Sequence, residues 1–211
     1  PELQRSLPVT YLSTNINTNI TGSSANYAEV RNYKVTHGRM FTSGEDAGRQ
    51  RFAVLGSSVP GMLNVNPGAI LGQTIQIRGQ PFEVIGVLEP KGSQGPWANP
   101  DEQILIPLKT AQYRIFGTDR LRSISVAIKE GVSLEQGMVD IERIMRREHK
   151  IRPGGDNDFQ IRNQSDLLQT FQQTTATFTA LLAGIAAVSL LVGGIGIMNI
   201  MLVSVTERTR E

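Results

Sequence analysis

Side chains suited to catalysis are few in this 211-residue chain. It has two histidines, His37 and His149, and no cysteine. A base–nucleophile pair or a metal site normally needs more such groups, and without cysteine there are neither disulfides nor thiolate ligands. His149 falls in the basic last turns of a predicted helix, where a cation complements the helix dipole. We therefore interpret both histidines as structural.

Three further patterns resemble catalytic or ligand-binding sites, but a structural role explains each of them better than a chemical one. Ser57 lacks the Gly-x-Ser-x-Gly spacing of a nucleophile elbow, and we interpret it as a helix cap. The carboxylate pairs Glu45/Asp46 and Asp156/Asp158 lie in predicted polar loops and are expected to be solvated. The glycines at 193, 194 and 196 have no following Lys-Ser/Thr of a phosphate-binding loop. The sequence thus predicts no catalytic residue, cofactor site or metal site in this chain.

The dominant element is a stretch without charge, which runs from Leu167 through Thr206. Its apolar part, 180–205, would be about 39 Å long as a helix, against about 30 Å for a bilayer's hydrocarbon core. A buried core helix of this length normally carries charge on a water-facing side. A secretory signal peptide would lie at the N-terminus. We predict a transmembrane helix at 180–206, preceded without a break by a stalk helix at 165–179.

The span contains residues suited to packing against another helix. Small residues recur four apart, as in Ala180/Gly184 and Ser189/Gly193, and let a second helix approach closely in lipid. Glycine is also simply more frequent in membrane helices, which is the plain alternative. The residues we expect to pack are Gly184, Ser189, Gly193, Gly194, Gly196 and Asn199.

Arginines follow the span and suggest its orientation. Glu207, Arg208 and Arg210 lie in 207–211, which we expect to be the cytoplasmic end, because Lys and Arg are enriched on that side. Residues 1 to about 175 would then be extracytoplasmic. The chain has no initiator methionine, and we expect it to be an excised piece of a longer polypeptide.

The residues before the stalk predict a mixed domain of helices and strands. The net charge of +2 gives no reason to expect nucleic acid. Alternation predicts a hairpin of 74–78 and 82–88, with 17–24 and 42–49 as polar loops. A strand–helix–strand unit is predicted from Ser123 to Asn163, its helix opened by a capping box at Ser133 and Gln136. Further strands are expected at 8–16, 51–56 and 104–107, and a short helix at 108–116.

The segment 191–211 resembles the second membrane helix of MacB-type ABC transporter permeases, the FtsX-like group. The soluble part is similar to that family's periplasmic core domain at 38–42, 52–56, 67–68, 74–77, 82–88 and 104–107. The resemblance implies an α+β fold over 1–164. Its two subdomains would be a mixed α/β porter-like part, 1–33 and 121–163, and an inserted β-rich sabre-like part, 34–120.

The resemblance also implies a function. The chain would belong to the permease of a bacterial inner-membrane efflux system that converts cytoplasmic ATP hydrolysis into motion of periplasmic domains and expels its substrate. The implied partners are an ABC ATPase that binds ATP and Mg²⁺, a second permease copy, a periplasmic adaptor, an outer-membrane channel and the bilayer. Relatives of this type handle macrolides, peptides, toxins or lipoproteins.

Two other classes of protein fit the same sequence. One is a single-span periplasmic sensor or binding domain, and the other is a membrane-tethered hydrolase. Further hydrophobic segments after residue 211 would favour the permease, and a kinase or a stop codon would favour the sensor. Activity of the soluble part without an ATPase would favour the hydrolase. The loop at 91–103, which holds the single Trp97, is expected either to pack or to contact a partner.

Overall fold

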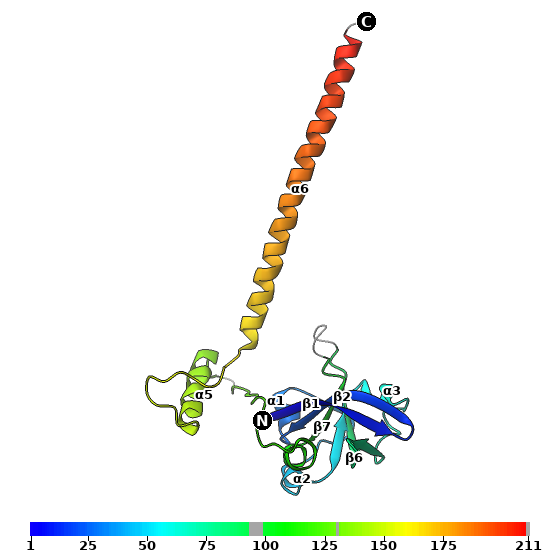
Figure 1. Cartoon of the computed structure of the whole chain (residues 1–211), viewed down its shortest axis with the longest axis vertical. Helices are drawn as coiled ribbons and strands as arrows, with labels where there is room; N and C mark the ends of the chain where they lie inside the picture. Colours follow the sequence, from blue (N-terminus) through cyan, green and yellow to red (C-terminus); the bar gives the residue numbers. More distant parts are fainter. Residues whose placement is uncertain (93–98, 130, 210–211) are drawn as a thin grey trace. The chain divides into compact units, whose positions relative to one another are not determined.

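The computed structural model describes residues 1–92, 99–129 and 131–209 (Figure 1). Contacts divide the chain into two units, Pro1–Lys129 and Glu130–Glu211. The strands of the first unit are β1 (Glu2–Tyr11), β2 (Thr14–Ser23), β3 (Val35–Gly38), β4 (Phe52–Leu55), β5 (Thr74–Ile77), β6 (Gln80–Leu88) and β7 (Gln103–Pro107). Its short helices are α1 (Tyr27–Val30), α2 (Ser43–Ala47), α3 (Val59–Met62), α4 (Leu108–Thr110) and the π-helix η1 (Ala111–Phe116). The second unit holds α5 (Leu134–Glu148) and α6 (Gln164–Arg208).

The seven strands form one sheet that closes on itself. Their order is β3-β6-β4-β7-β2-β1-β5, and β5 also pairs with the first half of β6. Six strands therefore make a small barrel, and β3 extends it along the second half of β6. The β2–β7 and β4–β6 pairs are parallel, and the other pairs are antiparallel. Closure leaves few strand edges free, which removes sites for unwanted pairing.

Apolar side chains fill the two faces of this sheet unequally. The larger cluster includes Ile20, Leu55, Phe82 and Ile104, which are at most 1% exposed. The smaller cluster lies on the opposite face of β4 and β7 and contains Val54 and Leu105 together with Tyr27, Phe41 and Leu88. Successive residues of β4 and β7 enter different clusters because side chains alternate across a strand. Both strands are thus buried on both faces.

The predicted hairpin at 74–88 is confirmed, and two predicted loops are corrected. Residues 17–24 continue into β2, because this strand pairs along its whole length with β1 and in parallel with β7. Residues 42–49 contain α2, which Thr42 and Glu45 open with a complete capping box. The helix expected at 108–116 is present as α4 followed by η1.

The predicted strands at 123–128 and 158–163 are wrong. Ser123 forms one isolated antiparallel bridge with Glu2, and the residues after it have no ladder. A strand exists only through hydrogen bonds to a neighbour. The segment 123–128 meets β1 only at its first residue, and among the described residues 158–163 pairs with no strand. Ile124 and Val126 are accordingly 51% and 55% exposed. The helix between them, α5, is confirmed, and the Ser133 hydroxyl accepts from Gln136 N at 3.2 Å.

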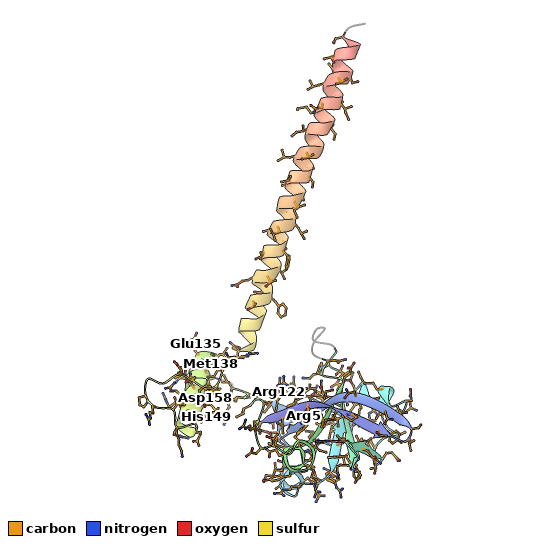
Figure 2. The ribbon with its side chains drawn as sticks, viewed as in Figure 1. Arg5, Arg122, Glu135, Met138, His149 and Asp158 are labelled. Atoms are coloured by element: carbon orange, nitrogen blue, oxygen red, sulfur yellow. The ribbon has the colours of Figure 1, made fainter. Side chains whose placement is uncertain are left out.

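The turn after α5 is tied back to the helix by two side chains. Arg146 donates to the carbonyls of Arg152 and Gly155, at 3.1 and 2.9 Å. His149 caps the helix and pairs with Asp158 at 2.8 Å (Figure 2). These bonds fold the chain after α5 back along it.

The proposed porter-like and sabre-like boundaries, at 33/34 and 120/121, stay a prediction. The contacts group residues 1–129 together, because β1 and β2 pair with β5 and β7 in one sheet.

Candidate functional site

Three of the four paired carboxylates considered for catalysis have structural partners. Glu45 takes part in the cap of α2, and Asp46 accepts from Lys109 N at 2.9 Å. Asp158 binds His149, whose ring also packs edge-on against Phe159. Among the described residues, no group of three or more His, Asp or Glu could hold a metal ion. These contacts give Glu45, Asp46 and Asp158 structural roles.

Ser57 is not the helix cap that we expected. The N-cap of α3 is Ser58, and its hydroxyl makes no capping bond. The Ser57 hydroxyl is buried and finds no hydrogen-bond partner in the described part of the chain. Neither serine has an adjacent base that could activate it, because the two histidines lie elsewhere, on β3 and at the end of α5.

The element with the clearest functional character is α6. It is one uninterrupted helix of 45 residues, yellow to red in Figure 1. Its residues Thr170–Thr206 are long and apolar enough to cross a membrane, and none of the most apolar stretch is buried. A core helix of a soluble protein would be covered, and a signal sequence would lie near the N-terminus. Exposure along its whole apolar length is what a helix surrounded by lipid requires.

Threonine hydroxyls in the first part of this stretch are satisfied by the helix itself. Thr174 Oγ1 donates to Thr170 O at 2.8 Å. The hydroxyls of Thr177 and Thr179 each donate to the backbone carbonyl four residues earlier, at 2.9 Å. Such bonds remove the cost of placing a hydroxyl in an apolar environment. The stretch Thr170–Thr206 contains the predicted span 180–206, and the boundary between the stalk and the span, at 179/180, stays a prediction.

The residues expected to pack against other helices do not share one face of α6. At about 100° per residue, Ser189, Gly193 and Gly196 lie within an arc of about 60°. Gly184 and Gly194 lie on the far side, each about 140° from Ser189, and Asn199 lies between the two sides, about 60° from both Gly196 and Gly184. A Cβ built on any of the four glycines would meet nothing within 4 Å. The helix thus offers two notched faces.

The end expected to be cytoplasmic is only partly described. Glu207 and Arg208 belong to the last turn of α6. Arg210 and Trp97 lie outside the described residues. The Thr209 hydroxyl donates back to the carbonyls of Val205 and Thr206, at 3.1 and 3.2 Å. The helical hydrogen bonds thus continue to the end of the described chain.

Residues 1–144 match the model of a protein family that is described as the MacB-like periplasmic core domain. The matched residues cover the whole first unit, Pro1–Lys129, which we call the barrel unit, and most of α5.

Curated relatives align over almost the whole chain. A protein of Bdellovibrio bacteriovorus named macrolide export ATP-binding/permease protein MacB is 39% identical over 204 residues, which are 96% of this chain and 31% of that protein. A protein of Pseudomonas fluorescens named pyoverdine export ATP-binding/permease protein PvdT is 35% identical over 91% of this chain and 29% of its own length. The chain spans about a third of the length of the curated relatives it matches.

Two solved structures share the fold. The periplasmic region of MacB from Actinobacillus actinomycetemcomitans superposes with a TM-score of 0.67 at 24% identity and covers 82% of this chain and 74% of its own. The extracellular domain of the noncanonic ABC-type transporter YknZ from Gram-positive bacteria gives a TM-score of 0.58 at 22% identity, over 77% and 79%. At these identities the likeness establishes the mixed α/β fold.

Proposed function

Because the chain belongs to the family of MacB-like periplasmic core domains, we propose that it supplies the periplasmic core and one membrane helix of a bacterial ABC exporter's permease. The observation that carries this proposal is the order of its parts. The family match over 1–144 is followed by one continuous helix whose uncharged residues, Thr170–Thr206, are long enough to span a bilayer. The chain itself is non-catalytic, and an ABC ATPase domain or subunit outside it binds ATP and Mg²⁺.

The geometry suits transmission of force better than passage of a substrate. At 1.5 Å per residue, α6 is about 68 Å long, roughly twice the hydrocarbon thickness. Helices bend gently and kink mainly at prolines, at pairs of glycine or serine, or at inserted groups. The helix α6 contains no proline, and it runs without a break through the adjacent Gly193 and Gly194. Movement that ATP binding produces at the cytoplasmic end is therefore carried to the other end. The periplasmic domain then pushes its cargo onward, and the cargo does not cross the inner membrane.

The proposal implies a defined sidedness in the inner membrane. Residues 1 to about 175 lie in the periplasm, and Glu207, Arg208 and Arg210 lie near the ATPase. The direction follows from the arginines after the span. A single cysteine at Leu12, whose side chain is 84% exposed, and another at Thr209 test it. An impermeant thiol reagent on intact spheroplasts should label Leu12→Cys and spare Thr209→Cys, and the reverse pattern would refute the sidedness.

The expected partners follow from the same proposal. A second permease copy packs through α6, using Ser189, Gly193 and Gly196 on one side, Gly184 and Gly194 on the other, and Asn199 between them. A periplasmic adaptor and an outer-membrane channel complete the route out of the cell. The names of the relatives specify macrolide and pyoverdine export. For this chain we propose cargo of the same broad kind, a macrolide, peptide, toxin or lipoprotein-like molecule taken up in the periplasm.

An efflux experiment tests the function as a whole. The full-length protein should raise macrolide tolerance and hydrolyse ATP in a host that lacks its own exporters, and a variant unable to hydrolyse ATP should not raise tolerance. Co-purification from membranes should recover the adaptor. A protein that neither hydrolyses ATP nor associates with an ATPase would instead fit a single-span sensor or binding domain.

A further inference from the structure

Glu2 is an almost buried carboxylate at the point where the chain leaves the barrel. The residue is 8% exposed. Its Oε1 accepts from Arg31 Nη2 at 2.7 Å, from Arg31 Nε at 3.2 Å and from the Ser125 hydroxyl. A buried carboxylate is costly unless several donors satisfy it. Here they come from one short helix and from the outgoing segment.

The backbone of Glu2 holds the same outgoing segment. Glu2 N donates to Ser123 O at 2.8 Å, and Glu2 O accepts from Arg122 N at 2.9 Å and Ser123 N at 3.3 Å. Arg122 is labelled in Figure 2, where it lies beside the start of β1. Side-chain and main-chain bonds of one residue thus fix three residues of the segment 122–125. After the bridge at Ser123, residues 124–129 have no regular secondary structure.

Arg31 is in turn anchored to the barrel unit. Its guanidinium lies 5.9 Å from the centre of the Tyr27 ring, and that ring stacks on Tyr33, also at 5.9 Å. Lys91 Nζ donates to Arg31 O at 2.5 Å and lies 4.1 Å from the Tyr33 ring centre. Gln103 of β7 donates to the Tyr33 hydroxyl at 2.7 Å. The Glu2–Arg31 pair is therefore rigidly connected to two core strands through the ends of β6 and β7.

The chain passes between its two units once, at 129/130. If Glu2 released the outgoing segment, the nearest upstream anchor would be the bond from Gln112 of η1 to the carbonyl of Asp119, at 3.2 Å. Residues 120–125 could then span up to about 20 Å, at about 3.4 Å per residue. Any part of this span that the folded chain does not already use would be slack, and it would absorb a displacement of the stalk before the barrel moved.

We infer that Glu2 and Arg31 form a clamp through which motion of α6 reaches the barrel unit, an inference that rests on the proposed function. Glu2 is a positioning residue in this scheme. It touches no cargo and no nucleotide, and it removes slack from the segment that connects the barrel unit to the second unit. The same clamp would keep the entering strand β1 and the outgoing segment side by side.

A reversible covalent substitute for the clamp separates coupling from folding. Glu2 and Ser123 form a hydrogen-bonded antiparallel pair, whose Cα atoms are typically about 5.5 Å apart, a separation that a disulfide can bridge. This chain contains no cysteine. In the full-length protein, freed of any cysteines elsewhere, Glu2→Cys/Ser123→Cys should be crosslinked by oxidant and released by reductant. The single variant Glu2→Cys is the matched control.

In the reduced double variant we expect ATP hydrolysis to continue and export to fall by about tenfold, within the usual range of coupling between sites. Oxidation should restore export in the double variant and leave Glu2→Cys impaired. Normal export by the reduced double variant, or no recovery on oxidation, would overturn the clamp. If the parent protein hydrolyses ATP and exports nothing, the proposed function fails instead. Amide exchange then decides on the clamp, because Glu2→Gln should speed exchange at Arg122 and Ser123 without unfolding the barrel.

Discussion

Gly22 of β2 packs directly against Ala111 of η1. A Cβ built on Gly22 would lie 2.3 Å from the Ala111 Cβ, far closer than two carbons that are not bonded to each other can approach. Ala111 is fully buried and belongs to the larger apolar cluster. The absence of a side chain at Gly22 therefore lets the π-helix sit on the barrel.

Gly22→Ala should destabilise the barrel unit by about 1–3 kcal/mol, the usual cost of overpacking a close contact. The matched control is Gly61→Ala. Gly61 lies in α3 and has nothing within 4 Å of its would-be Cβ. Alanine there should be neutral or stabilise by up to about 1 kcal/mol. Denaturant unfolding of both variants measures the difference, and equal stabilities would contradict the contact.

Local patterns in the sequence predicted part of this fold. The hairpin of β5 and β6 and the helix α6 were predictable, because alternation and an absence of charge are properties of consecutive residues. β2 was not, because Thr18 and Asn19 are polar and become part of a strand only by pairing with β1 and β7. The strand expected at 123–128 failed for the converse reason. Its alternating pattern is right, but it pairs with β1 only at Ser123, and the residues after Ser123 find no partner strand in the described part of the chain.

The capping box at Thr42 was present in the sequence as Thr-x-x-Glu and could have been found. The contacts of Glu2 could not, because its partners Arg31 and Ser125 lie 29 and 123 residues away. Nothing local distinguishes a buried glutamate from an exposed one. Likewise, the grouping of the α6 glycines by face needed the uninterrupted helix as well as their spacing.

Because of Glu45, the free energy of unfolding of the protein should decrease as the pH falls into the acid range. Arg39 holds it with two bonds, at 2.6 and 2.8 Å. The Arg39 hydrogen bonds and the backbone N–H of Thr42 lower the pKa of Glu45 to about 2, from 4.5. A carboxyl whose pKa is lower in the folded state stabilises the fold at pH values above its unfolded-state pKa. This stabilisation is lost as the pH falls through the folded-state pKa. The contribution should therefore be complete above about pH 5 and disappear between 4.5 and 2.

Glu45→Gln isolates the charge, because glutamine can still accept the capping bond from Thr42 N. Its loss of stability at neutral pH should be small, about 0.2–1 kcal/mol, since the pair is at the surface. The difference from the parent should shrink to zero near pH 2. Glu29→Gln, at a carboxylate without an ion pair among the described residues, should show no such trend. A pH-independent difference at position 45 would exclude the ionic explanation.

The stalk must be unbroken if it transmits force. Thr175→Pro removes a hydrogen bond inside α6 and sets the proline ring against the carbonyl of Phe171, at a cost of about 3 kcal/mol or more to a straight helix. We expect export to be abolished while ATP hydrolysis persists. Thr175→Ala keeps the helix and should export normally. Full export by the proline variant would rule out a rigid lever, and loss of export in the alanine variant would point to the threonine hydroxyl instead.

Large side chains introduced on one or the other notched face of α6 can show which face a second copy contacts. Gly196→Leu fills the face shared with Ser189 and Gly193, and Gly194→Leu fills the far side. If two copies meet through the first face, disulfide crosslinking from Ser189→Cys should fall with Gly196→Leu and persist with Gly194→Leu, because a bulky side chain blocks close approach only where it points. Both substitutions should lower export and leave the barrel unit folded, since both positions belong to the other unit, Glu130–Glu211. Crosslinking lost only with Gly194→Leu would place the second copy on the opposite face.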